Sequence, residues 1–327
     1  MSDEILLSIK NLKTHFAVGK SIVKAVDGVS FDLKSGKTFA IVGESGSGKS
    51  ITALSIMGLL PDNLASTERG KILFNNKDLL SFEEKEMRKI RGNSISMIFQ
   101  EPMTSLNPVY DLSFQISEVI MLHQNKNKKE AKKIAIEMLD LVGIPEPQKR
   151  IDSFPHELSG GMRQRAMIAM ALSCNPKILI ADEPTTALDV TIQAQIIELM
   201  QDLQKKLGMS IIFITHDLGV VSEISDHVMV MYLGNVMEIA ETKELFNNPL
   251  HSYTKSLIDI APQISDEKRE IKLLRGEIPS PINPPSGCVF RTRCPNPGIG
   301  CKGGDIEMGL IEAKPGHWVD RCCYECN

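Results

Sequence analysis

The stretch Gly43-Glu-Ser-Gly-Ser-Gly-Lys-Ser50 decides the fold of this chain. It follows the apolar run 38–42 and precedes residues 51–60, whose pattern is helical. A strand, a glycine-rich turn and a helix N-terminus bring several backbone N–H groups to one point, with the positive end of the helix dipole behind them. Glycine lets the chain curl closely around an anion because no Cβ is in the way. The stretch, called the phosphate loop below, therefore predicts a site for a nucleoside triphosphate.

Two side chains of the phosphate loop have the chemistry that such a site needs. The ammonium group of Lys49 can reach the β- and γ-phosphates, and the hydroxyl of Ser50 can ligate Mg²⁺. The other residues predicted to contact nucleotide here are Gly43, Ser45, Gly46, Ser47, Gly48 and Ile51. Because every fixed position of the motif is filled between a strand and a helix, a chance glycine-rich loop is a poor explanation.

Composition limits the class of protein. The chain has 327 residues, enough for one large domain or two smaller ones, and its net charge is −4 with 24% charged residues. This balance gives no reason to expect a nucleic acid as partner. The sequence shows no apolar segment long enough to span a bilayer and no secretory signal. We therefore expect a soluble, cytosolic protein that contacts a membrane only through a partner.

Apolar strands alternate with helices in the middle of the chain. Residues 177–181 and 210–215 have the composition of buried strands, and 191–207 between them has a helical pattern. This order is typical of an α/β fold with a mainly parallel sheet. Residues 1 to about 35 alternate apolar and polar positions, which predicts antiparallel strands. From about residue 248 proline and glycine become frequent, which predicts a separate, loop-rich segment.

Two acidic residues end one of the apolar strands. Asp182 and Glu183 follow the run 178–181, and ligands of open α/β sheets bind at this end of the strands. We expect Asp182 to hold Mg²⁺, directly or through water, and Glu183 to orient the water that attacks the γ-phosphate. Adjacent acids at a strand end are common, so this prediction depends on their occurring together with the phosphate loop.

Together these motifs resemble those of the ATP-binding subunits of ATP-binding-cassette (ABC) transporters. Residues 158–165 are similar to the family signature, with Met162 where glutamine is more common. Further motifs occur in the family's order between residues 5 and about 245: Phe16 at the adenine-stacking position, where tyrosine is more usual, Gln100 in the Q-loop, Ala187-Leu188-Asp189 in the D-loop, and His216 as the switch histidine. An ordered set of this size is highly specific.

The resemblance implies an architecture and an activity. It implies an ATPase with the α/β fold of a P-loop NTPase, made of a RecA-like core, an antiparallel β-subdomain and a helical subdomain at about 101–162. This nucleotide-binding domain is expected to occupy residues 1–247. A small, irregular, cysteine-rich domain is expected at 248–327.

The resemblance also implies how ATP is held and hydrolysed. Ser159, Gly160 and Gly161 are implied to form a helix N-terminus that grips the γ-phosphate of ATP bound to the opposite subunit, so that two subunits enclose two nucleotides. His216 is implied to hydrogen-bond the γ-phosphate, and Gln100 to ligate Mg²⁺ and to link it to the segment that contacts the membrane subunit. Considered singly, these two residues have plain alternatives, a structural histidine and a surface-loop glutamine.

The later part of the sequence narrows the resemblance. Residues 100–108 are similar to the form seen in dipeptide, oligopeptide and nickel importers, and 248–257 and 276–295 are similar to the C-terminal extension of peptide-importer subunits. The resemblance implies a location at the cytoplasmic face of the membrane, with a homologous ATPase subunit in a heterodimer, two transmembrane permease subunits and, indirectly, an extracytoplasmic peptide-binding protein. No nucleic-acid partner is expected. The alternatives are an ATPase for nickel or another solute, a cassette ATPase outside transport, and a metal-responsive subunit with vestigial ATP turnover.

Six of the seven cysteines lie in the last 40 residues. In a reducing cytosol such a group favours metal ligation over disulfides. Four thiolates suit a [4Fe–4S] cluster or a tetrahedral zinc ion. The resemblance favours the iron–sulfur cluster, with the ligands Cys288, Cys294, Cys301 and Cys322. Cys323 or Cys326 is an alternative to Cys322, and cysteines that are unligated or joined in disulfides are a further alternative.

Overall fold

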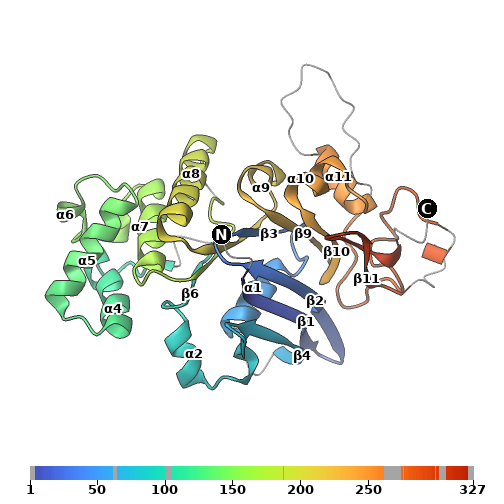
Figure 1. Cartoon of the computed structure of the whole chain (residues 1–327), viewed down its shortest axis with the longest axis horizontal. Coiled ribbons are helices and arrows are strands. Elements are labelled where there is room, and N and C mark those ends of the chain that lie inside the picture. Colours follow the sequence, from blue (N-terminus) through green and yellow to red (C-terminus); the bar gives the residue numbers. More distant parts are fainter. Residues whose placement is uncertain are drawn as a thin grey trace, which may run out of the picture. The chain divides into compact units, whose positions relative to one another are not determined.

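The computed structural model describes residues 4–61, 65–100, 105–186, 188–260, 274, 276–298, 300–301 and 307–322, with the backbone alone for 65–69. The chain divides into two compact units. The first is built mainly from Lys34–Lys37 and Ser81–Ile214, and the second from Ile5–Leu33, Thr38–Leu80 and Thr215–Asn327. Figure 1 shows the helices and strands of both units and labels them where there is room.

Four strands of the second unit form a sheet in the order β2-β1-β4-β5 (Figure 1). Their bounds are Ile5–Val18 for β1, Ser21–Lys34 for β2, Ala65–Phe74 for β4 and Lys77–Asp78 for β5. β1 and β4 are antiparallel, with Leu7 opposite Phe74 and Ile9 opposite Ile72. These four apolar side chains are buried, so the two strands supply part of the core.

The other strands of the second unit have the order β11-β12-β10-β9-β3. Their bounds are Thr38–Val42 for β3, His227–Tyr232 for β9, Asn235–Glu241 for β10, Leu310–Lys314 for β11 and His317–Asp320 for β12. β3 and β9 are parallel. β10 runs antiparallel to β9, β12 runs antiparallel to β10, and β11 runs antiparallel to β12. The C-terminal segment is therefore not wholly irregular, because its hairpin extends the sheet that carries the phosphate loop.

These strands are accompanied by α1 at Lys49–Met57, α9 at Leu218–Ile224, α10 at Thr242–Asn247 and α11 at Ser252–Ile260. One apolar cluster joins this part of the unit to the C-terminal segment. It includes Val230 and Tyr232 of β9, Tyr253 of α11, and Phe290 and Cys288 from the segment that follows. The C-terminal segment thus shares its core with the strands around the phosphate loop.

The first unit contains three parallel strands in the order β6-β7-β8, at Ile95–Ile98, Ile178–Asp182 and Ser210–Thr215. Every residue of the three strands is buried, as continuous apolar runs in a parallel sheet require. The predicted strands 177–181 and 210–215 match β7 and β8 to within one residue at each end.

Within the residues that the structure describes, the same unit contains the helices α2 at Glu84–Ile90, α4 at Leu112–Gln124, α5 at Lys128–Leu141, α6 at Pro147–Arg150, α7 at Gly160–Leu172 and α8 at Val190–Leu207. A short 3₁₀ turn lies at Pro155–Glu157 in this unit, and another lies at Leu79–Ser81, where the chain passes from the second unit to the first. Helices α4, α5 and α7 pack against one another (Figure 1). Four of these helices have an N-cap residue whose side chain accepts a backbone N–H group. The N-cap residues are Asp111, Asn127, Ser159 and Asp189.

The structure supplies no membrane span within the part of the chain that it describes. None of the helices there combines the length and the apolar character needed to cross a bilayer.

Candidate nucleotide-binding site

The phosphate loop curls between β3 and α1. Gly43 and Gly48 have φ angles of +151° and +102°, which residues with a Cβ rarely adopt. A Cβ on Gly43 would lie 2.2 Å from the carbonyl oxygen of Met231, and one on Gly48 would lie 2.4 Å from that of Ala25. Neighbouring backbone therefore excludes any side chain at these two positions. Gly48 also begins α1 without a side-chain cap, as an anion-binding helix N-terminus requires.

The ammonium group of Lys49 is held by backbone carbonyls of the phosphate loop itself. Lys49 is buried, and its Nζ donates to the carbonyl oxygens of Gly43 and Glu44 at 2.7 and 3.0 Å. It also lies 3.5 Å from Oγ of Ser47. The ammonium group is thus placed inside the curl, where it can exchange these partners for phosphate oxygens.

Two residues that the sequence analysis did not select hold Glu44 in this loop. The backbone N–H of Glu44 donates to the hydroxyl of Tyr253 at 3.0 Å. Arg293 donates through Nη1 and Nη2 to the two carboxylate oxygens of Glu44, at 2.6 and 3.1 Å. The hydrogen bond with Glu44 is the main cause of the raised pKa of Arg293, and burial raises the pKa of Tyr253. A sequence separation of 249 residues leaves no local signal for the contact with Arg293.

The predicted catalytic acids follow the end of β7 in the first unit. Asp182 is buried at the strand terminus, and Glu183 comes next with a left-handed φ of +46°. Its backbone N–H donates to the carbonyl of Ile214 at 2.9 Å. Strained conformations of this kind occur where the surrounding structure fixes a side chain for function. The direction of the Glu183 carboxylate is therefore set by its backbone.

Gln100 and Glu183 meet as a pair, although 83 residues separate them. Nε2 of Gln100 donates to Oε2 of Glu183 at 3.0 Å, and Oγ1 of Thr186 donates to the same oxygen at 2.9 Å. Thr186 was not singled out from the sequence. Two neutral donors on one carboxylate oxygen fix the orientation of the acid and leave its charge in place.

The predicted signature residues lie at the N-terminus of α7. Oγ of Ser159 accepts the N–H of Met162 at 3.3 Å, and Ser159 and Gly160 are exposed. A Cβ on Gly160 would meet nothing within 4 Å, so this helix end is open to a ligand. The buried Gln164 donates through Nε2 to the carbonyl of Pro184. It therefore ties α7 to the residue that follows Glu183.

Some predicted residues can be placed only within their own unit. Phe16 is half-buried near the end of β1, and His216 is exposed directly after β8, both in the second unit. The predicted D-loop residue Ala187 and residues 101–104 after Gln100 lie outside the described residues, as do Cys323 and Cys326.

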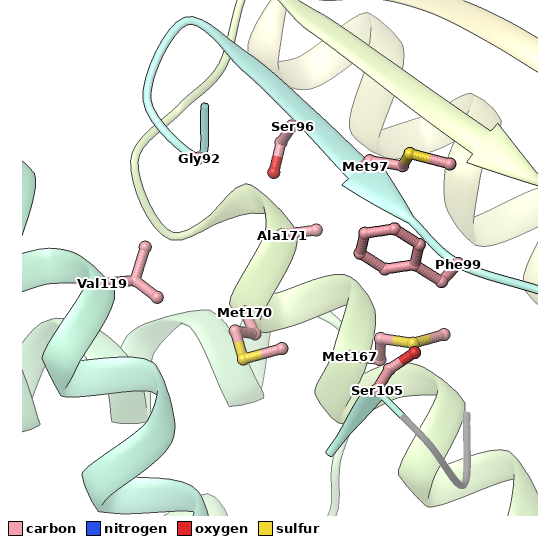
Figure 2. A pocket seen from close by; sticks show the side chains of 9 residues that line it. All are labelled: Gly92, Ser96, Met97, Phe99, Ser105, Val119, Met167, Met170 and Ala171. Atoms are coloured by element: carbon pink, nitrogen blue, oxygen red, sulfur yellow. The ribbon is translucent and has the colours of Figure 1, made fainter. Parts of the chain in front are cut away.

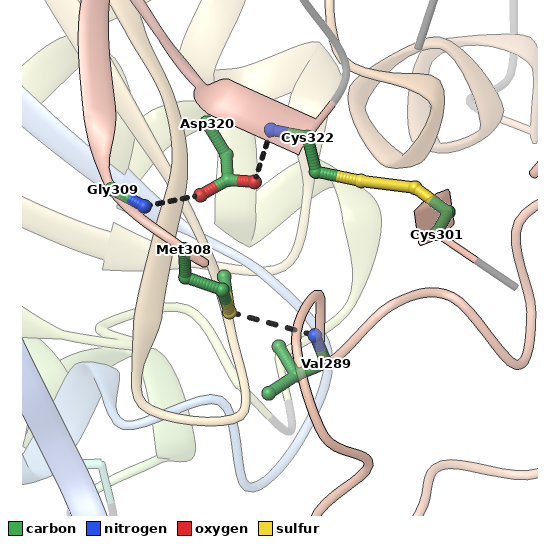
Figure 3. The surroundings of a disulfide bond; sticks show 6 residues. All are labelled: Val289, Cys301, Met308, Gly309, Asp320 and Cys322. Atoms are coloured by element: carbon green, nitrogen blue, oxygen red, sulfur yellow. Dashed lines mark hydrogen bonds between the residues drawn. A yellow bond between two sulfur atoms is a disulfide. The ribbon is translucent and has the colours of Figure 1, made fainter. Parts of the chain in front are cut away.

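The structure pairs two of the four predicted cysteine ligands. Cys301 and Cys322 form a disulfide (Figure 3), so these two predicted ligands carry no thiolate in this structure. Their Cα atoms are 6.8 Å apart, within reach of a disulfide. Cys322 is further held because its N–H donates to Asp320, at 3.1 Å. Cys288 lies in the same apolar cluster, Cys294 packs against it, and both remain thiols.

A second group of candidate metal ligands lies beside Cys288. The ligand atoms of His251, Cys288 and Asp320 lie within 4.8 Å of one another, and all three residues are buried. Nδ1 of His251, however, accepts the N–H of Tyr253 at 3.0 Å. A neutral imidazole that accepts at Nδ1 carries its proton on Nε2, whereas a metal-bound histidine donates from its second nitrogen. His251 in this arrangement therefore does not fit a metal ion.

The buried His251 predicts a loss of stability in acid. Burial lowers its pKa from 6.5 to about 4, so below pH 6.5 the unfolded chain takes up a proton that the folded chain refuses. The contribution of His251 to the free energy of unfolding is fully present above pH 6.5 and is lost as the pH falls towards 4. Between pH 7 and pH 5 the free energy of unfolding decreases by about 2 kcal/mol on this account. Urea unfolding at these pH values should show that His251→Asn, whose amide oxygen can still accept from Tyr253, loses about that much less than the wild type. Equal pH dependence in the two proteins would contradict the assignment.

Comparison with known proteins agrees with this geometry. Residues 26–186 match a family model described as ABC transporter, and residues 237–301 match one described as oligopeptide/dipeptide transporter, C-terminal region. The chain is 53% identical to the oligopeptide transport ATP-binding protein AppD of Bacillus subtilis, over 98% of this chain and 97% of that protein. It is also 53% identical to the dipeptide transport ATP-binding protein DppD of the same organism, over 91% of this chain and 89% of that protein.

Solved structures show the same cassette. A dimeric post-hydrolysis structure of the ATP-binding cassette MJ0796 bound to ADP and Pi has a TM-score of 0.65 and 28% identity, over 72% of this chain and 98% of that one. The structure of cbiO1 from Clostridium perfringens, part of the ABC transporter complex cbiONQ, has a TM-score of 0.63 and 30% identity, over 75% of this chain and 92% of that one.

These likenesses confirm the predicted fold of the nucleotide-binding cassette and the predicted ATPase class. They cover both the phosphate loop and the segment that follows β10, so the resemblance is not confined to motifs shared by all nucleotide-binding folds. The chain belongs to the ATP-binding-cassette family, among the members that carry the oligopeptide/dipeptide transporter C-terminal region.

Proposed function

We propose that this chain hydrolyses ATP to drive the import of dipeptides or oligopeptides through a membrane permease. One observation carries the choice of substrate: a phosphate loop and an oligopeptide/dipeptide transporter C-terminal region occur in one chain. Relatives that are 53% identical over nearly the whole chain are named as oligopeptide and dipeptide transport ATP-binding proteins. In this role the chain acts at the cytoplasmic face of the membrane.

In this proposal each residue of the site has a separate role in binding or hydrolysing ATP. Lys49 and the N–H groups of the phosphate loop bind the triphosphate, and Ser50, Asp182 and Gln100 hold Mg²⁺. The metal, when bound, neutralises the charge that develops on the phosphate oxygens. Glu183, oriented by Gln100 and Thr186, aligns the attacking water and accepts its proton. His216 contacts the γ-phosphate, and Phe16 stacks on adenine.

A second ATPase subunit completes the site in this proposal. The exposed N-terminus of α7 at Ser159, Gly160 and Gly161 offers N–H groups and no obstructing side chain, and it would bind the γ-phosphate of ATP on the partner. The cassette MJ0796, which has the same fold, is a dimer in its structure with ADP and Pi. The partner in a peptide importer would be a homologous subunit, which makes a heterodimer.

The first unit also offers a surface for the permease. A pocket of about 490 Å³ lies between β6, α4 and α7, and Figure 2 shows that its lining is mainly apolar, with Met97, Phe99, Met167 and Met170 among the side chains. Phe99 is 41% exposed and adjoins Gln100. We assign this pocket to a helix of the permease, since an apolar helix face fits such a groove and Phe99 connects it to the Gln100–Glu183 pair.

The four predicted cysteine ligands fit a metal cluster only when the disulfide is reduced. Cys288, Cys301 and Cys322 belong to one apolar cluster of the second unit, and Cys294 packs against it, so reduction would leave four thiols in or beside that cluster. We propose that these residues then hold a [4Fe–4S] cluster, with zinc as the alternative metal. The cluster would act there as a structural crosslink of a segment with little core of its own.

Metal analysis tests this assignment. Protein purified without oxygen is expected to contain about four iron and four sulfide ions per chain and to absorb broadly in the visible range. Cys288→Ser should lose both, because one of four ligands is removed. Cys174→Ser, at a buried cysteine of the first unit, should keep both. Stoichiometric zinc without iron, or a colourless metal-free protein, would contradict the iron–sulfur assignment.

Peptide uptake tests the transport function. Cells that carry Glu183→Gln in place of the wild-type chain, with an intact permease, are expected to take up labelled dipeptides or oligopeptides at no more than about a tenth of the normal rate. Glu198→Gln changes an exposed acid of α8 and should leave uptake unchanged. Normal peptide uptake in the Glu183→Gln strain would show that the chain serves another solute or another process.

A further inference from the structure

The phosphate loop contains an acid of its own. Glu44 follows Gly43, and its side chain is 29% exposed. A carboxylate beside bound triphosphate repels the ligand unless a cation neutralises it. The carboxylate of Glu44 therefore repels the triphosphate that the loop is predicted to bind, and a neighbouring residue compensates its charge.

Arg293 from the C-terminal segment supplies the cation. Its side chain is 5% exposed, and its guanidinium contacts both carboxylate oxygens of Glu44 at 2.6 and 3.1 Å. Two parallel N–H···O bonds are the strongest arrangement that arginine forms with a carboxylate. Nη1 also donates to the hydroxyl of Tyr232 at 3.3 Å, and the guanidinium carbon lies 5.7 Å from the centre of that ring. The arginine is therefore fixed from more than one side.

Packing of aromatic rings holds the turn that carries Arg293. The N–H groups of Arg293 and Cys294 donate to the carbonyl of Phe290 at 2.9 and 3.0 Å. Phe290 is completely buried, with its ring centre 5.4 Å from that of Tyr232 and 5.2 Å from that of Tyr253. Tyr253 in turn accepts the N–H of Glu44. The C-terminal segment thus reaches both the side chain and the backbone of one phosphate-loop residue.

We propose that Arg293 is a positioning residue of the ATP site, which neutralises Glu44 and fixes the start of the phosphate loop. The C-terminal region thereby sets the affinity of the chain for ATP. This inference rests on ATP binding at the phosphate loop, as the proposed function does, but it depends on no particular transported solute.

The proposal predicts that removing the charge of Glu44 reverses the effect of removing Arg293 on the affinity for MgATP. In Arg293→Gln the Glu44 carboxylate is left uncompensated, and the Kd for MgATP is expected to rise about tenfold, the size of one lost charge-assisted contact. In the double variant Glu44→Gln/Arg293→Gln the repulsive charge is also gone, so the Kd should return to within about threefold of the wild-type value. Glu44→Gln alone should bind MgATP as tightly as the wild type or more tightly.

The experiment is a titration of the full-length chains with a fluorescent ATP analogue and MgATP as competitor. Arg291→Gln is the matched control, since Arg291 lies two residues away and donates to Ser286; its Kd should be unchanged. Arg293→Lys keeps the charge but not the fork and should give an intermediate Kd, and it replaces Arg293→Gln if that variant does not fold. An Arg293→Gln Kd within twofold of wild type, or a double variant as weak as Arg293→Gln, would overturn the inference. Failure of the wild-type chain to bind ATP would instead refute the proposed function.

Discussion

The Glu183→Gln variant is expected to bind MgATP normally and to hydrolyse it about a thousandfold more slowly than the wild-type chain. The amide has the size of the carboxylate and can still accept hydrogen bonds from Gln100 and Thr186 through its oxygen. It cannot accept a proton from water. The change therefore removes the proposed base and leaves the binding residues in place. Release of phosphate by the assembled transporter is the measurement, beside the Kd of the isolated chain.

The matched control for this prediction is Glu198→Gln on α8, the same chemical change at an exposed acid. It should hydrolyse ATP at the wild-type rate. If Glu183→Gln kept more than a tenth of the wild-type rate, another group would have to act as base, and the role assigned to the Gln100–Glu183 pair would be wrong.

The Gly160→Glu variant should abolish hydrolysis without changing how the chain binds its own nucleotide. A side chain at Gly160 enters open space, and an acid in the first turn of α7 suits the helix dipole, so the fold should not be weakened. In the proposed dimer, however, that carboxylate faces the γ-phosphate bound to the partner. Loss of such an anion-stabilising helix end is expected to lower ATPase activity at least about a hundredfold.

Two measurements separate this effect from misfolding. The thermal midpoint of Gly160→Glu should equal or exceed the wild-type value, and its Kd for MgATP as an isolated chain should stay within about twofold. Gly160→Ala adds only a methyl group to the same open space and should retain most of the activity. Full activity of Gly160→Glu in the assembled transporter would show that the N-terminus of α7 does not contact nucleotide.

Local motifs in the sequence predict much of the site. The phosphate loop, the acids at the end of β7 and the serine that caps α7 each depend on a few consecutive residues, because a turn, a strand end or a helix cap is built from neighbours in the chain. The steric requirement for glycine at positions 43 and 48 could not be predicted in this way. It arises from the backbone carbonyls of Met231 and Ala25, which are distant in the sequence.

Contacts between distant segments could not be predicted in the same way. Arg293 lies 249 residues from Glu44, and no pattern of residues near it in the sequence points to the phosphate loop. Gln164, within the predicted signature helix, donates a hydrogen bond to the carbonyl of Pro184, and only the tertiary fold brings these two residues together. The hairpin of β11 and β12 was missed because its strands have only five and four residues and follow a stretch rich in proline and glycine.

The central claim is that ATP is enclosed between the phosphate loop of one subunit and the N-terminus of α7 in another. Light scattering on the Glu183→Gln chain, mixed with MgATP and either a second copy or its homologous companion subunit, tests this claim most directly. The account predicts a stable two-subunit complex with MgATP, which falls apart with MgADP and does not form when both chains carry Gly160→Glu. Subunits that stay single in saturating MgATP, or a complex that forms equally well without nucleotide, would contradict it.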